Sequence, residues 1–155
     1  MIEIERKFLV QSDEFIQQAT KKSTVVQGYL SKDPNRTVRV RIKDQKSFLT
    51  IKGKSNASGM SRYEWEKEIP LSEGKELIKL SLPKVIEKTR YFVPYEGNMF
   101  EVDIFEGIHK GLILAEIELN SELEEIKLPA WIGKEVTGDP KYYNASLSSI
   151  VAKNS

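Results

Sequence analysis

Charged and apolar residues alternate along much of this chain, and this alternation restricts its fold more than any other feature. Residues 2–8 read IEIERKF. Because successive side chains of a β-strand point to opposite faces, an extended strand here places Glu3, Glu5 and Lys7 on one face and apolar side chains on the other. The two carboxylates repel each other unless a cation lies close to both, and a hard divalent metal such as Mg²⁺ fits that place. Taken alone, the segment also fits an ordinary antiparallel strand with one solvated face.

Six further segments repeat the alternation, and in most of them charges of one sign share a strand face. They span residues 38–43, 48–52, 62–66, 86–91, 100–104 and 115–119, and their charged side chains on these faces are Arg39, Arg41, Lys43, Lys52, Arg62, Glu64, Glu66, Lys88, Arg90, Glu101, Asp103, Glu116 and Glu118. Like charges along one solvated face are unfavourable. If the strands instead close into an antiparallel barrel, the charged faces converge on a lumen, and the apolar faces lie outward under helices and loops.

A lumen with so many charges restricts what the protein can bind. Buried ions are tolerated only when they are paired, hydrated or bound to a ligand, because an uncompensated buried charge costs several kcal/mol. A polyanion with its metal satisfies both signs, since lysine and arginine bind phosphate oxygens and carboxylates bind the cation that bridges those oxygens. The sequence therefore predicts a tunnel that binds a chain of phosphates together with a divalent metal.

The ordered set of motifs resembles the CYTH superfamily of triphosphate tunnel metalloenzymes over nearly the whole chain. The Glu3-x-Glu5-x-Lys7 signature stands near the amino terminus, and the motifs that follow in the family's order are Arg39-x-Arg41, residues 50–53, Arg62-x-Glu64-x-Glu66, residues 87–91, Glu101-x-Asp103, Gly111-Leu112, residues 115–118, residues 135–137, Tyr142 and Asn144. The resemblance implies one domain over residues 1–155 with an α+β, mainly β, fold. It also implies an eight-stranded antiparallel barrel that forms a charged tunnel, with a few short helices packed outside, and a requirement for Mg²⁺ or Mn²⁺.

The resemblance also implies roles for individual residues. The acids expected on the metal side are Glu3, Glu5, Asp103, Glu116 and Glu118, and Glu64, Glu66 or Glu116 is expected to hold a second ion. The cations expected to bind phosphate are Lys7, Arg39, Arg41, Lys52, Lys88 and Arg90, with Lys141 or Lys134 as a basic residue of the carboxy-terminal segment. The alternatives for activating a water molecule are this second ion and Lys7 with Tyr29, although Tyr29 also fits a packing role only. Glu5 is expected to be required for turnover as a metal ligand.

Composition excludes several classes of protein. The 24 basic and 23 acidic residues nearly cancel to a net charge of +1, so no overall field favours nucleic acid or an anionic membrane. Cysteine is absent, which removes disulfides, thiolate metal sites and thiol nucleophiles. We find neither the apolar core of a signal peptide nor an apolar run long enough to cross a bilayer, and we expect a cytoplasmic protein. The oligomeric state is open, with a homodimer as one alternative.

Helical signals are few and short. We expect a helix from Ser12-Asp13 to about Thr20 and another from Leu71 to before Pro83. Residues 121–124 fit a capping box, and Asn144 fits the cap of a last helix whose apolar stripe is Ala145, Leu147, Ile150 and Val151. Residues 54–61 read as a mobile loop at the tunnel mouth.

Four other residues are given ordinary structural roles. The lone histidine, His109, lies between Gly107 and Gly111 in what reads as an exposed turn. Trp65 and Trp131 have the rings to stack on a nucleobase, but their apolar neighbours favour packing in the wall or its covering. Lys43 stands at a strand end and is interpreted as solvated or as an outer ion-pair partner.

The leading functional hypothesis is metal-dependent hydrolysis of a small-molecule triphosphate. Inorganic tripolyphosphate is the favoured substrate, with water attacking the terminal phosphorus in line and pyrophosphate and orthophosphate as products. One alternative is a class IV adenylate cyclase that makes cyclic AMP from ATP, and another is a thiamine triphosphatase. A third is a non-catalytic module that binds polyphosphate or nucleotides, but the acidic pairs would weaken the binding of an anion without metal.

Overall fold

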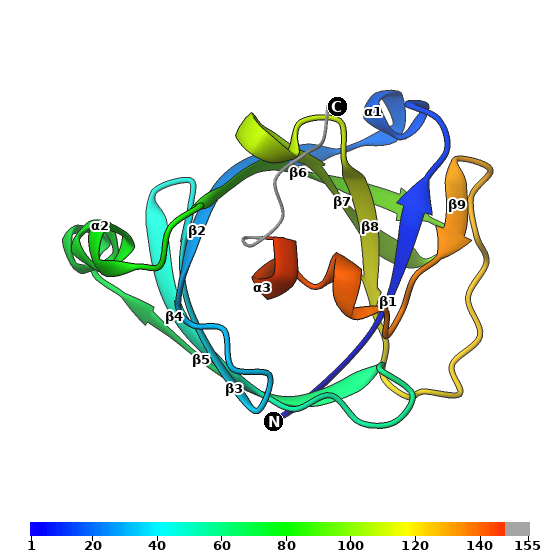
Figure 1. Cartoon of the computed structure of the whole chain (residues 1–155). Helices are drawn as coiled ribbons and strands as arrows, with labels where there is room; N and C mark the ends of the chain where they lie inside the picture. Colours follow the sequence, from blue (N-terminus) through cyan, green and yellow to red (C-terminus); the bar gives the residue numbers. More distant parts are fainter. Residues whose placement is uncertain (148–155) are drawn as a thin grey trace.

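The computed structural model describes residues 1–147, and the strands within that range form one antiparallel sheet that closes into a barrel (Figure 1). The sheet order is β5-β4-β3-β2-β6-β7-β8-β1-β9, and an additional pairing between β5 and β1 closes eight strands into the barrel. The strands are β1 (Ile2–Val10), β2 (Lys21–Ser31), β3 (Arg36–Lys43), β4 (Lys46–Gly53), β5 (Ser61–Ile69), β6 (Ile86–Tyr95), β7 (Asn98–Phe105), β8 (Ile113–Glu118) and β9 (Ile132–Glu135). The predicted eight-stranded antiparallel barrel is confirmed.

The strand β1 closes the barrel and is held on both of its edges. Along one edge it pairs with β8, with Glu5 opposite Glu118 and Lys7 opposite Glu116. Along the other edge its first residues pair with β5 and its last residues pair with β9. This double pairing fixes which face of β1 points inward, because the side-chain period of a strand is two residues.

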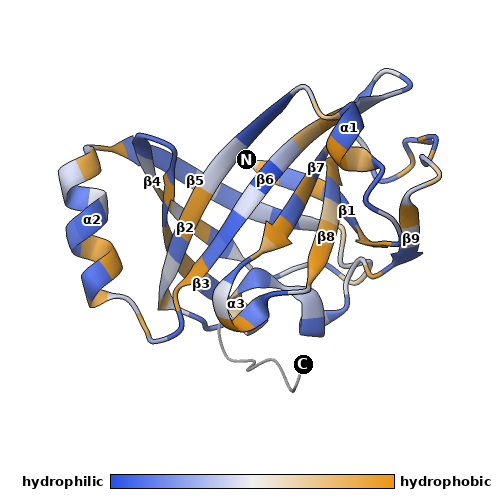
Figure 2. Cartoon of the chain, turned by 90° about the horizontal axis from the view of Figure 1, so that it is seen from above, coloured by the Kyte–Doolittle hydropathy of each residue, from blue (hydrophilic) through white to orange (hydrophobic). Residues whose placement is uncertain are grey.

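The main apolar core lies outside the barrel wall, as the alternation predicts. It includes Phe8, Phe15, Phe100 and Trp131, with the Trp131 ring centroid 5.7 Å from that of Phe15 and 5.6 Å from that of Phe100. Alternating hydrophilic and hydrophobic bands along the strands are visible in Figure 2. The covering is incomplete, however, because Tyr63 and Trp65 on β5 are 51% and 40% exposed. The expectation that every apolar face lies under a helix or loop is therefore wrong for β5.

Two short helices pack outside the barrel. The helix α2 (Leu71–Leu80) has the predicted bounds and packs on β2, β3 and β4. The helix α1 (Phe15–Gln18) is shorter than predicted, because the chain becomes extended at Ala19 and the backbone N–H of Thr20 donates to the carbonyl of Phe92. Strand pairing thus ends this helix early.

Residues 121–124 form no helix, although their side chains make capping contacts. The Leu123 N–H donates to the Ser121 hydroxyl, and the Asn120 N–H donates to the Glu124 carboxylate. These bonds stabilise a single turn, which the sequence pattern alone does not separate from the start of a helix.

The last described helix, α3 (Asn144–Leu147), lies at one end of the barrel and within the ring of strands in the end-on view (Figure 1). Its Leu147 is part of a buried apolar cluster, and its Ala145 packs against that cluster, whose other members are Tyr29, Ile86, Phe105, Leu114 and Val136. The short helix η1 (Gly107–His109) follows Phe105 in the sequence, and the short helix η2 (Pro140–Tyr142) follows Val136. Ile150 and Val151 of the predicted apolar stripe lie outside the described residues.

The prediction of an exposed turn at His109 is wrong. The side chain is 5% exposed, and its Nε2 atom contacts the carbonyl oxygen of Leu147. The imidazole therefore holds the end of α3 against the barrel through Leu147, a partner more than 30 residues away in the sequence.

Among the helices of residues 1–147, none has the length and apolar character that a membrane span needs.

Candidate active site

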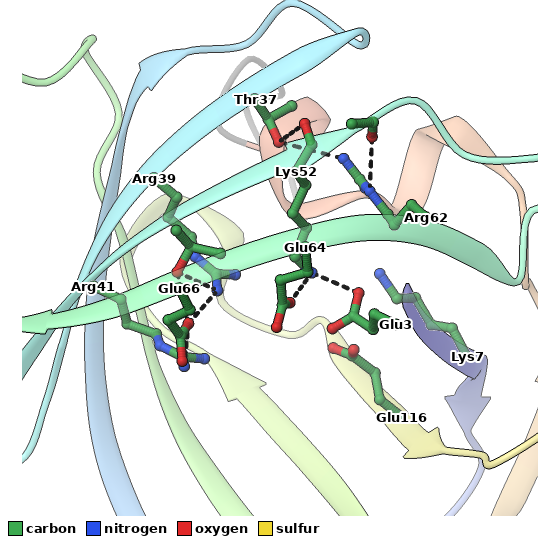
Figure 3. A network of polar contacts seen from close by, with 12 residues as sticks. Glu3, Lys7, Thr37, Arg39, Arg41, Lys52, Arg62, Glu64, Glu66 and Glu116 are labelled. Carbon is green, nitrogen blue, oxygen red and sulfur yellow. Dashed lines mark hydrogen bonds and ion pairs between the residues drawn. The ribbon is translucent and has the colours of Figure 1, made fainter. Parts of the chain in front are cut away.

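The barrel lumen holds a cavity of about 620 Å³ whose walls carry both signs of charge. Figure 3 shows that these side chains project toward one another from β1, β3, β4, β5 and β8. Most predicted site residues line this cavity, namely Glu3, Glu5, Lys7, Tyr29, Arg39, Arg41, Lys52, Glu64, Glu66, Arg90, Glu116 and Glu118. Four others, Lys88, Asp103, Lys134 and Lys141, do not line it.

The strand register explains why these residues meet. Neighbouring antiparallel strands place residues directly opposite each other, and alternate residues share a face. The pairs Glu5–Glu118 and Lys7–Glu116 join β1 to β8, and the pair Lys52–Glu64 joins β4 to β5. Carboxylates thus concentrate where β1 and β8 meet.

The carboxylates at that junction perturb one another. Burial raises the pKa of Glu5 well above its usual value, and Glu116 and Glu3 raise it further. Burial also acts to raise the pKa of Glu116, but Lys7, a hydrogen bond with Glu5, and Arg90 bring it well below its usual value. Burial and the neighbouring acids Glu101, Glu3 and Glu116 raise the pKa of Glu118. This crowding of acids disfavours full ionisation unless a further cation is present.

A divalent metal fits this donor set. Carboxylate oxygens are the ligands that Mg²⁺ and Mn²⁺ prefer, and Mg²⁺ usually keeps waters and substrate phosphates in its remaining positions. Within residues 1–147 no three acidic or histidine side chains are grouped so as to hold a metal ion by themselves. A metal at this junction would therefore need further ligands besides Glu3, Glu5 and Glu118, such as the phosphates of a substrate.

Lys52 separates two of the acids. Its Nζ atom lies 2.8 Å from Glu3 Oε1 and 3.4 Å from Glu64 Oε2. Burial opposes ionisation of Glu3, but Lys52 outweighs it and lowers the pKa of Glu3. Glu3 and Lys52 are thus charged together, and the lysine lies beside the acids of β1 where it can bind a phosphate oxygen.

The arginines of β3 form the cationic side of the cavity. Glu66 Oε2 lies 3.4 Å from Arg41 Nη2 and 3.8 Å from Arg39 Nη2. The Thr50 hydroxyl donates to Glu66 Oε2 at 2.6 Å and accepts from Arg39 Nη2 at 3.4 Å. Burial, together with Arg39 and Arg90, lowers the pKa of Arg41 to about 10.

The Nε atoms of Arg39 and Arg41 are buried and have no hydrogen-bond partner in the described chain. A buried guanidinium N–H without an acceptor costs free energy, and an anion in the cavity would bring acceptor oxygens to these two side chains. This pair of unsatisfied donors favours a phosphate ligand.

Lys88, Arg90 and Asp103 form a separate buried cluster in the wall. Lys88 Nζ lies 2.7 Å from Asp103 Oδ2, and Arg90 donates to both Asp103 oxygens at 2.8 and 2.9 Å. Both carboxylate oxygens of Asp103 are therefore engaged by cations. Arg90 also reaches Glu101 at 3.2 Å and lines the cavity, whereas Lys88 and Asp103 lie behind it.

Two residues expected from the sequence to lie in the tunnel are held by the carboxy-terminal segment. Lys7 Nζ donates to the carbonyl of Tyr142 at 3.0 Å and lies 5.8 Å from the centre of the Tyr143 ring. Tyr29 is 5% exposed and packs in the apolar cluster with α3.

Lys141, the predicted basic residue of the carboxy-terminal segment, is exposed, and its Nζ atom lies 5.4 Å from the centre of the Tyr142 ring.

Sequence reasoning missed the polar residues that orient the charged ones. Thr50 orients Arg39 and Glu66, and the Thr37 hydroxyl accepts from Arg62 Nη2 at 3.3 Å (Figure 3). Both threonines stand on inward-facing positions of β3 and β4, which is the signal that identifies them.

Comparison with known proteins identifies the family of this chain. The model of the CYTH domain matches residues 1–150. The chain belongs to the CYTH domain family. It is 46% identical over 153 residues to an inorganic triphosphatase from Acetivibrio thermocellus, covering 98% of this chain and 96% of that protein. It is 36% identical over 154 residues to an inorganic triphosphatase from Nitrosomonas europaea, covering 96% and 97%. The crystal structure of the inorganic triphosphatase NE1496 superposes with a TM-score of 0.69 at 31% identity, covering 96% of this chain and 95% of that one.

Proposed function

We propose that this CYTH protein is a metal-dependent inorganic triphosphatase that hydrolyses tripolyphosphate to pyrophosphate and orthophosphate inside its barrel. The observation that carries the proposal is one cavity in which the acids of β1 and β8 and arginines with unsatisfied buried donors line the same space. The names of the two relatives that match this chain over almost its full length support the same activity.

The acids of β1 and β8 would hold Mg²⁺ or Mn²⁺. Glu3, Glu5 and Glu118 are the proposed ligands, with Glu64 or Glu116 available to a second ion. When bound, the metal supplies charge neutralisation between the phosphate oxygens and the carboxylates, and it lowers the pKa of a coordinated water. Because Lys52 already contacts Glu3 and Glu64, it would shift toward the substrate as the acids bind metal.

The cations align the substrate. Arg39 and Arg41 would bind phosphate oxygens through their unsatisfied donors, and Arg90, oriented by Asp103, would bind from β6, two strands away from β3 in the sheet. The water oxygen attacks the terminal phosphorus, the bridging P–O bond breaks, and pyrophosphate leaves. Positioning and charge neutralisation account for most of the expected rate. The water's proton passes to a carboxylate of the acidic cluster, and Lys7 stabilises charge beside Glu116.

Three predicted roles take a different form in this proposal. Lys88 and Asp103 act through Arg90, because both carboxylate oxygens of Asp103 already contact cations. Lys141 would bind phosphate only after its side chain turns away from the Tyr142 ring.

The test is phosphate release from tripolyphosphate, measured with Mg²⁺ or Mn²⁺ and again after chelation. Glu5→Gln is expected to lower kcat at least about 100-fold, since it removes a metal-ligand charge. Glu87→Gln is the matched control, because Glu87 is exposed on the outward face of β6. Undiminished turnover by the Glu5 variant, or by the chelated enzyme, contradicts the proposal. Release of cyclic AMP from ATP, or faster hydrolysis of thiamine triphosphate, would favour the alternative activities.

A further inference from the structure

A pair of lysines shares one aromatic ring at the end of the barrel away from α3. Lys21, the first residue of β2, places its Nζ atom 5.5 Å from the centre of the Phe92 ring. Lys43, the last residue of β3, places its Nζ atom 5.0 Å from the same centre. Two like charges are thus gathered around one ring, an arrangement that the ring quadrupole stabilises only partly.

Neither ammonium group has an ion-pair partner within the described chain. Two carboxylates that interact electrostatically with these lysines already have other partners. Glu101 contacts Arg90 at 3.2 Å, and the Asp44 carboxylate accepts a hydrogen bond from the Thr24 N–H. Lys43 is surrounded by cations, and partial burial together with Arg41, Arg90 and Lys21 lowers its pKa. An anion would relieve this repulsion.

One member of the lysine pair connects it to the interior of the cavity. Lys43 lines the cavity and Lys21 does not, and the next inward-facing residues along β3 are Arg41 and then Arg39. Three cations therefore follow one another along β3 inward from the rim, with the Glu66 carboxylate against Arg41 and Arg39. An excess of one sign of charge between low-dielectric walls focuses the field and raises the local concentration of an oppositely charged ligand.

We propose that Lys21 and Lys43, placed around Phe92, form an outer binding site at the rim of the barrel. This site captures condensed phosphate before the phosphate reaches Arg41 and the metal site. This inference rests on the proposed function, since condensed phosphate is the substrate that function requires. The lysine pair acts on capture of the anion and not on cleavage of the P–O bond, because it lies at the rim while the acids of β1 and β8 lie inside. In this proposal Lys43 takes a binding role in place of the solvated role interpreted from the sequence.

The test compares two double variants that remove the same charge. Lys21→Met with Lys43→Met changes the rim, whereas Lys22→Met with Lys67→Met removes two exposed lysines on outward strand faces. In about 0.01 M salt the rim variant is expected to raise KM for tripolyphosphate about five- to tenfold with less than a twofold change in kcat. The difference should vanish near 1 M salt, where the screening length falls to about 3 Å. The control variant should keep the wild-type KM.

A binding measurement separates this inference from the proposed activity. Calorimetric titration of tripolyphosphate in the presence of a chelator should give the same five- to tenfold weaker binding for the rim variant, with no turnover involved. Equal affinities of the rim and control variants would overturn the capture step. A wild-type protein that binds but does not hydrolyse tripolyphosphate would refute the activity and leave the capture step standing.

Discussion

Asp103→Asn removes the one negative charge that lies between two buried cations. Asp103 is fully buried, the side chains of Lys88 and Arg90 are 1% and 9% exposed, and the three contacts span 2.7 to 2.9 Å. Asparagine preserves the shape, so the main loss is charge compensation. Breaking a buried ion pair by removing one partner costs about 3–5 kcal/mol. Since about 1 kcal/mol shifts Tm by roughly 2–4 °C in a domain of this size, Tm should fall by about 6–20 °C.

The assay is thermal unfolding by circular dichroism at several pH values. Burial would raise the pKa of Asp103, but Arg90 and Lys88 outweigh it, so the folded pKa lies below the ordinary value. The stabilisation is therefore complete above the unfolded pKa of about 4 and is lost as the pH falls through the folded value. The variant and the wild type should converge in strong acid. Asp13→Asn, at an exposed residue, is the control and should change stability by less than about 0.5 kcal/mol. A shift below about 2 °C at neutral pH would refute the reasoning.

Three other substitutions test packing, a surface ion pair and side-chain orientation. Gly28→Ala would place a Cβ atom 2.4 Å from Ser81 Oγ, so we expect a loss of about 1–3 kcal/mol in urea unfolding. Glu135→Gln should cost about 0.5–1 kcal/mol at pH 7, and this cost should disappear as the pH falls through the lowered folded pKa of Glu135, because the Arg6 hydrogen bonds stabilise only its ionised form. Thr50→Val should lower kcat/KM about tenfold by releasing two charged neighbours, while Thr50→Ser stays within about threefold of the wild type. These predictions would be contradicted by an unchanged urea midpoint, by a Glu135→Gln loss that persists in strong acid, or by equal kinetics of the two Thr50 variants.

The strand pattern predicted the site because the period of a strand is local. Glu3, Glu5 and Lys7 share a face in any extended strand, and the closed barrel turns that face inward. The same reasoning placed Arg39 and Arg41 in the cavity, and both line it.

The helical predictions failed where pairing partners distant in the sequence decided the outcome. The helix α1 ends early because the Thr20 N–H donates to the carbonyl of Phe92. His109 is buried because Leu147 and α3 close over it. No local pattern contains these contacts, since each partner is supplied by a remote part of the chain.

The amino-acid sequence by itself determined which side chains share a strand face, and from it a charged lumen follows once the sheet closes. Only the tertiary structure decided which charges become partners. Asp103 is on the expected face but is engaged by Lys88 and Arg90, whereas Arg39 and Arg41 keep buried donors without a partner. The physical reason is that the direction of a side chain depends on backbone geometry within a few residues, while its pairing depends on distances across the barrel that the chain sets only when all eight strands close.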